Sequence, residues 1–141
     1  MPRPPLPAAA LGAAGLLPFM AGALATHGLF PGIANPFTGV LILQAYGSAI
    51  LAFMGGCLWG FAVQAGKAGW RELGASVTPG LWAASVAFSE NALLSLAIGF
   101  VFLQVLDLIF RGWGIGPGWW LTLRLPLTLV VLICLLAGVF V

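Results

Sequence analysis

One acidic side chain, that of Asp107, lies inside a long apolar stretch of this chain and is the group most able to do chemistry. A charged group within a membrane span is costly unless it is paired, so it is a functional hypothesis by default. Arg111 follows four residues later on the same helical face, within salt-bridge reach, and Arg124 stands one turn into the next apolar segment. Asp107 lies only about 5 Å from the end of its segment at 1.5 Å rise per residue, a depth from which side chains reach water. These positions favour a clamp between helices, with Gln104 on the same face, over a proton or ion relay.

Other residue types that support catalysis or metal binding are scarce. His27 is the single histidine, and it has no cysteine or carboxylate near it in sequence. A zinc site wants three or four His, Cys or carboxylate ligands, so we expect no metal, no cofactor and no catalytic residues. Cys57 and Cys134 would lie about 13 Å and about 22 Å from the same membrane face at 1.5 Å per residue, too far apart in depth for a disulfide.

The second apolar segment has the most small and polar residues. At 100° per residue Gln44, Ser48, Gly55 and Ala62 form one stripe, and a neighbouring stripe includes a G-x-x-x-G pair. Small residues let helices approach closely, and polar ones bond across to neighbours. This favours a central packing helix, and the alternative is a small polar site around Gln44, Tyr46 and Ser48. The candidate site in this segment comprises Gln44, Tyr46, Ser48, Gly55, Gly56, Trp59 and Gly60.

Composition decides the class of protein that must position these groups. Of the 141 residues, 62% are hydrophobic and only 6% are charged, against about 25% charged in soluble domains. A soluble chain of this size could not cover so much apolar surface, and a disordered chain would be poor in it. The net charge of +2 is too small and too scattered for nucleic-acid binding. We expect an integral membrane protein.

The apolar segments predict an all-α bundle of about five transmembrane helices in a single membrane domain. The expected helices cover residues 6–25, 38–65, 76–88, 91–110 and 119–141, with a polar loop over 66–74. The third is short for a span, and one long helix over 76–110 is the alternative. We favour two helices because Ser89 is a good N-cap and Glu90 in a first turn suits the positive helix end.

The basic residues support five spans. With five, all of them lie on one side of the membrane: Arg3, Lys67, Arg71, Arg111 and Arg124. With four spans they would split three against two. The positive-inside rule then places the N-terminus in the cytoplasm and the C-terminus outside. Four tryptophans gather on the basic side, as in an aromatic belt: Trp70, Trp113, Trp119 and Trp120.

The first segment has a second interpretation, as a cleaved signal peptide. It begins with one basic residue and ends in the A-x-A sequence of residues 23–25. The single basic residue and the length of the apolar run favour a permanent span instead.

One stretch of the second segment is recognisable. Residues 43–63, LQAYGSAILAFMGGCLWGFAV, resemble the signature of the domain-of-unknown-function 3429 family of small membrane proteins, and LGAAGLLPF (11–19), SVTP (76–79) and LRLPLTL (123–129) agree with it. The resemblance covers nearly the whole chain and implies a polytopic helical protein of bacterial or mitochondrial inner membranes. It implies no activity. Relatives often carry a His or Arg just before the Trp-Gly pair, where this chain has Leu58.

Three functions are compatible with these features. The first is a non-enzymatic accessory, assembly or stabilising subunit of a larger complex in the bacterial cytoplasmic (inner) membrane, with other membrane subunits or further copies of this chain as partners. The second is a small transporter or channel component, although the inverted repeats common in transporters are not evident. A lipid-modifying enzyme ranks lower, because paired acids, bases and nucleophiles are too few.

Overall fold

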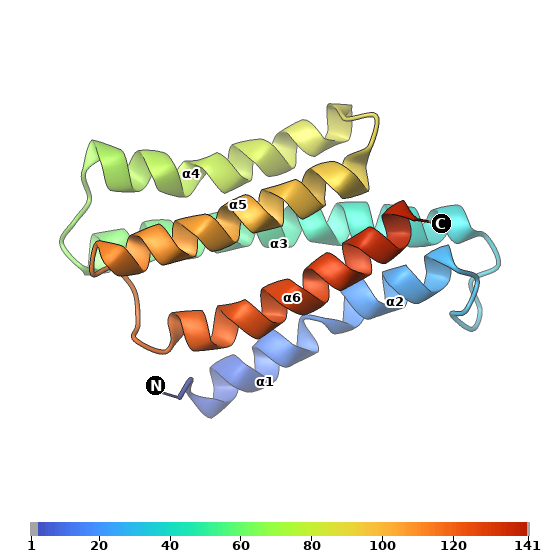
Figure 1. Cartoon of the computed structure of the whole chain (residues 1–141), viewed down its shortest axis with the longest axis horizontal. Coiled ribbons are helices and arrows are strands. Elements are labelled where there is room, and N and C mark those ends of the chain that lie inside the picture. The colour runs from blue at the N-terminus through green and yellow to red at the C-terminus, as the bar shows by residue number, and fades with distance from the viewer. Residues whose placement is uncertain (1–2, 141) are drawn as a thin grey trace.

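The computed structural model describes residues 3–140, and over that range the chain is an antiparallel bundle of helices without strands (Figure 1). In chain order the elements are α1 (Leu6–Ala14), α2 (Leu17–Thr26), α3 (Pro36–Gln64), α4 (Trp70–Ser85), the 3₁₀ turn η1 (Val86–Phe88), α5 (Ala92–Gly112) and α6 (Trp120–Val139). The long α3 packs against α2, α4 and α5, and α6 packs against α5 and α2. The expected all-α class is confirmed.

Within residues 3–140, four helical segments are long and apolar enough to cross a membrane. They are Leu6–Thr26, which contains α1 and α2, and Pro36–Gln64, Ala92–Gly112 and Trp120–Val139. The fifth segment, α4, has 16 residues and begins among charged side chains, yet it runs beside α5 along the length of that helix (Figure 1). The protein is therefore a multi-pass membrane bundle of five helical segments, of which α4 is the shortest.

The start of α4 corrects the predicted third helix, 76–88. The helix begins six residues earlier, at Trp70, and Arg71 and Glu72 belong to its first turn rather than to a loop. A carboxylate in a first turn is stabilised by the positive end of the helix. Glu72 therefore favours a helix start in a stretch whose polar residues predicted a loop. The regular α-helix then ends at Ser85, and η1 completes the segment.

The break before α5 is where it was expected, but another residue caps the helix. Ser89 is extended and ends η1, whereas the Asn91 side chain accepts a hydrogen bond from the backbone N–H of Leu94. Asn is as good an N-cap as Ser, so the prediction that Ser89 caps this helix was wrong. The alternative of one continuous helix over 76–110 is excluded as well.

The first segment is interrupted rather than continuous. α1 ends at Ala14 and α2 starts at Leu17, with Pro18 in its first turn, where a missing backbone N–H is tolerated. The hydroxyl of Tyr46 on α3 donates a hydrogen bond of 3.0 Å to the carbonyl of Gly15 at this break. The kink is therefore fixed against the central helix.

Glycines in the left-handed region close α3 and α5 at the same end of the bundle. Gly66 has φ +70° and Gly114 has φ +74°. The backbone N–H of the residue after each glycine donates a hydrogen bond of 2.9 Å to the carbonyl five residues before that residue, as in a Schellman motif. The two loops are then joined, because Lys67 Nζ donates to the Trp113 carbonyl. The Arg71 guanidinium lies 4.0 Å from the centroid of the Trp113 ring, within cation–π range.

The N-terminus, the α3–α4 loop and the α5–α6 loop lie at one end of the bundle, on the left in Figure 1. All the basic residues lie at this end: Arg3 precedes α1, Lys67 is in the α3–α4 loop, Arg71 is in the first turn of α4, Arg111 is in the last turn of α5, and Arg124 is in the first turns of α6. At the other end, His27 Nε2 lies 2.9 Å from the carbonyl oxygen of Ala137. The structure thus has a basic end and an end without Lys or Arg among residues 3–140.

Candidate functional site

A buried ion pair joins α5 to α6. Arg124 Nε donates to Asp107 Oδ2 at 3.2 Å, with side chains only 3% and 1% exposed. Trp120 Nε1 donates to the other carboxylate oxygen at 2.9 Å. Asp107 therefore receives a donor on each oxygen, both from the first turns of α6. Pairing with hydrogen bonds is the condition under which a buried charge is tolerated.

Arg111 is not the partner of Asp107. It lies in the last turn of α5 and is exposed, and with Asp107 it lines a small cavity of about 130 Å³ beside the glycine-rich loop. The sequence allowed two partners for Asp107, and in the structure the partner is Arg124, because the α5–α6 contact brings that side chain into the core. Within the described part of the chain, this pair forms the clamp between helices.

The ion pair belongs to a larger polar cluster in which several atoms lack partners. Gln104 precedes Asp107 by one turn, and Thr128 follows Arg124 by one turn, so the antiparallel register places both on the same side of the pair. Buried atoms without a hydrogen-bond partner are Gln104 Oε1, Gln104 Nε2, Arg124 Nη2 and Thr128 Oγ1. Such atoms are uncommon in native interiors. Thr128 was not among the residues predicted from the sequence, although its spacing of four residues from Arg124 was a usable signal.

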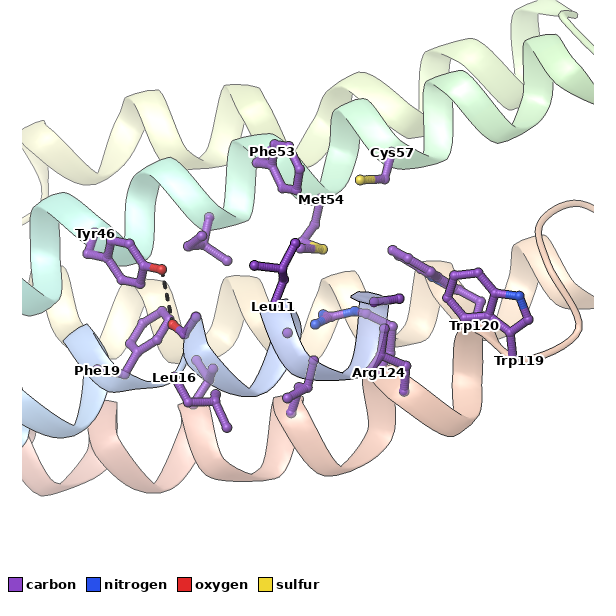
Figure 2. Close-up of a pocket in the computed structure, with 17 residues that line it drawn as sticks. Leu11, Leu16, Phe19, Tyr46, Phe53, Met54, Cys57, Trp119, Trp120 and Arg124 are labelled. Carbon is purple, nitrogen blue, oxygen red and sulfur yellow. Dashed lines mark hydrogen bonds between the residues drawn. The ribbon is translucent and has the colours of Figure 1, made fainter. Parts of the chain in front are cut away.

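A cavity of about 400 Å³ lies between α1, α3 and α6 (Figure 2). Tyr46 and Phe19 lie at one end of the group that Figure 2 labels, and Trp119 and Trp120 lie at the other. Arg124 comes from α6, and the nitrogens of its guanidinium point in among these apolar side chains. The cavity is thus a mostly apolar space with one cationic side chain in its wall.

The seven residues proposed as a polar or packing site on α3 do not form one site. Tyr46 lines the cavity, whereas Gln44 and Ser48 are half-buried and do not line it. Gly55 packs so closely on α4 that an added Cβ would lie 2.7 Å from the Ser76 carbonyl oxygen.

The remaining three members, Gly56, Trp59 and Gly60, are exposed, and a Cβ at either glycine would meet nothing within 4 Å. The predicted packing stripe through the G-x-x-x-G pair therefore faces outward from this chain. The packed stripe lies on nearly the opposite face of α3, roughly 170° away at 3.6 residues per turn, and its members are Leu43, Gly47, Leu51, Gly55, Leu58 and Ala62.

No group of three His, Cys, Asp or Glu side chains among residues 3–140 could hold a metal ion. Cys57, at the cavity wall, and Cys134, in the core, are free thiols. His27 lies at the end of the bundle opposite the Asp107 cluster. Nothing in this arrangement points to catalysis.

Comparison with known proteins places the chain in a family. Residues 4–140 match the family described as "Protein of unknown function (DUF3429)". The chain is 33% identical to transmembrane protein 69 of Xenopus tropicalis over 151 aligned positions, which cover 95% of this chain and 54% of that protein. It is 34% identical to transmembrane protein 69 of Mus musculus over 139 aligned positions, which cover 92% of this chain and 54% of that protein.

The chain thus spans about half the length of the curated relatives it matches. No solved structure matches it. The resemblance seen in α3 is confirmed along nearly the whole sequence, and the chain belongs to the DUF3429 family of membrane proteins, a family of unknown function.

Proposed function

We propose that this protein is a non-enzymatic accessory subunit that packs against one transmembrane helix of another membrane protein. The observation that carries the proposal is an open, glycine-floored groove on the outer side of α3 and α4. The membrane would be a bacterial cytoplasmic or mitochondrial inner membrane, with the basic end of the bundle on the cytoplasmic or matrix side.

The groove is formed by two adjoining hollows. The first, of about 370 Å³, lies between Gly56 on α3 and Gly80 on α4. The second, of about 420 Å³, continues toward the basic end of the bundle beside Trp70. Both hollows are bordered by Trp59 and Val77, so together they follow the α3–α4 seam over several turns.

The floor of this groove suits a helix better than a lipid chain. At Gly56 and Gly80 an added Cβ would meet nothing within 4 Å, so no packing within this chain requires glycine there. In membranes small residues are enriched where the backbones of two helices approach closely, and dispersion between packed surfaces supplies the attraction. We expect a partner helix to lie in the seam, with the exposed rings of Trp59 and Trp70 against its sides.

Bulky side chains in the groove test the proposal without disturbing the fold. The variant Gly56→Leu/Gly80→Leu fills the seam, and Gly112→Leu makes the same change on α5, where a Cβ also meets nothing within 4 Å. Each protein is tagged, expressed in its native membrane and purified in mild detergent. Native gels and mass spectrometry then report partner stoichiometry, and thermal unfolding checks that each variant is folded.

The wild type and Gly112→Leu are expected to purify with one membrane protein at fixed stoichiometry, and the double variant is expected to be folded but free. A complex that survives the double substitution would exclude this groove as the interface. Recovery of the folded wild type alone, or only with copies of itself, would contradict the accessory role.

A transporter or channel component is less well supported. The polar path envisaged through Gln44, Tyr46 and Ser48 is divided, because Tyr46 bonds to the Gly15 carbonyl and the other two do not line the cavity beside it. Flux in proteoliposomes that falls with Gln44→Ala and Asp107→Asn would revive this alternative.

A further inference from the structure

We propose that the cavity between α1, α3 and α6 binds a membrane-soluble molecule through a neutral carbonyl oxygen, which accepts a hydrogen bond from Arg124. The carbonyl could belong to an isoprenoid quinone or to the acyl ester of a membrane lipid. This inference does not depend on the accessory role, because the cavity and the α3–α4 groove share no residue.

The donor is built into the wall of the cavity. Arg124 is 3% exposed, and its Nε is engaged by Asp107, but Nη2 is buried without a hydrogen-bond partner. An unpaired N–H of a charged group in a low-dielectric interior is costly. Arg124 lines the cavity, so a ligand oxygen beside its guanidinium would supply the missing acceptor after a small shift of the side chains that cover Nη2, and the guanidinium is held in place by the bonds around Asp107.

The charge balance selects a neutral acceptor over an anion. The carboxylate of Asp107 already neutralises Arg124, so a bound carboxylate or phosphate would leave a net negative charge in the buried interior of the bundle. An uncompensated charge in a protein interior is strongly disfavoured. A carbonyl oxygen receives the same charge-assisted hydrogen bond without adding charge.

The remaining wall suits an apolar body attached to that carbonyl. Besides Arg124, the side chains around the space are mainly aliphatic or aromatic, including Phe19, Phe53, Met54 and Trp119 (Figure 2). The volume of about 400 Å³ is within the range of small-molecule sites, which combine apolar walls with a few placed polar groups. The hydroxyl of Tyr46 already donates its hydrogen bond to the Gly15 carbonyl, so Arg124 is the group that would orient the ligand.

Binding is measured on the full chain in nanodiscs of ether lipids, which contain no ester carbonyl. The probes are decylubiquinone for a quinone, dioleoylglycerol for an acyl ester, oleate for an anion and hexadecane for an apolar chain alone. Isothermal titration calorimetry gives affinity and stoichiometry. Decylubiquinone or dioleoylglycerol is expected to bind one to one, and whichever of them binds identifies the source of the carbonyl.

Two kinds of variant separate the roles of donor and cavity. Asp107→Leu/Arg124→Leu removes the donor together with its counter-charge, and the affinity for the carbonyl ligand is expected to fall roughly 10- to 100-fold, the value of one charge-assisted hydrogen bond. Should that variant not fold, Cys57→Phe fills the cavity from α3 and leaves the ion pair intact. Its control, Ala49→Phe, adds the same ring at an exposed α3 position outside the cavity.

Loss of binding in Cys57→Phe with retention in Ala49→Phe supports the site. The proposal is overturned if neither carbonyl ligand binds, if oleate binds more tightly than both, or if hexadecane binds as tightly as they do. Equal affinity of a carbonyl ligand for the wild type and for a folded Asp107→Leu/Arg124→Leu variant would also overturn it.

Discussion

Removal of Arg124 is expected to be among the most destabilising single changes in this protein. In Arg124→Ala the carboxylate of Asp107, 1% exposed, keeps only the hydrogen bond from Trp120. Breaking a buried ion pair by deleting one partner costs about 3–5 kcal/mol. An orphaned aspartate can instead take up a proton, which from an ordinary carboxyl pKa near 3.9 costs about 4 kcal/mol at pH 7. We therefore expect a loss of about 3–4 kcal/mol.

The double variant distinguishes an ion pair from two independent losses. Replacing a buried pair by apolar residues of similar size is often nearly neutral. Asp107→Leu/Arg124→Leu still leaves the Trp120 N–H without its acceptor, at about 1–3 kcal/mol. The double variant should thus lose no more than Arg124→Ala alone. Because Asp107→Leu by itself would leave the buried Arg124 without its counter-charge, also at about 3–5 kcal/mol, the coupling energy between the two positions is expected to be several kcal/mol.

Reversible unfolding in mixed micelles, followed by tryptophan fluorescence, measures these free energies. Arg111→Ala is the matched control, because that arginine is exposed and such surface changes stay within about 0.5 kcal/mol. The reasoning is refuted if Arg111→Ala and Arg124→Ala destabilise equally. It is also refuted if the loss in Asp107→Leu/Arg124→Leu equals the sum of the losses in Asp107→Leu and Arg124→Leu measured singly.

Three further changes test the fold. Gly55→Ala places a Cβ 2.7 Å from a backbone carbonyl of α4 and should cost about 1–3 kcal/mol in unfolding free energy, whereas Gly56→Ala, which meets nothing within 4 Å, should cost none. Tyr46→Phe removes the donor to the α1–α2 break and should lower the unfolding free energy by about 1 kcal/mol; an unchanged value would show that this bond does not hold the kink. Topology is tested in a cysteine-free background with a membrane-impermeant thiol reagent. A thiol introduced at Ala68 should react only from the cytoplasmic or matrix side, and a thiol introduced at Ser89 should react only from the opposite side. The reverse pattern would overturn the proposed orientation.

Local sequence patterns were sufficient for the class of this protein and for most of its helices. Long apolar runs, turn-forming residues and the positions of the basic side chains depend on neighbours in sequence, and they predicted the helical bundle with one basic end. The start of α4 was misjudged because Arg71 and Glu72 look like loop residues, although a first helical turn accommodates them. Ser89 and Asn91 are both good caps, so sequence could not choose between them.

The candidate site was only partly predictable. Asp107 and Arg124 were recognised because a charge within an apolar run is conspicuous in sequence. The unpartnered atoms of Gln104 and Thr128, and the cavity that Tyr46 and Trp120 share, arise where separate helices meet.

The sequence by itself determined that this chain is an all-helical membrane protein of the DUF3429 family, with its basic residues at one end and one acid that needs a partner. Only the tertiary structure decided that the partner is Arg124 rather than Arg111, and that Gly55 faces the core while Gly56 faces outward. The physical reason is that composition and spacing fix which residues share a face of one helix. The rotation of each helix about its axis and its register against its neighbours are set by packing among segments distant in sequence.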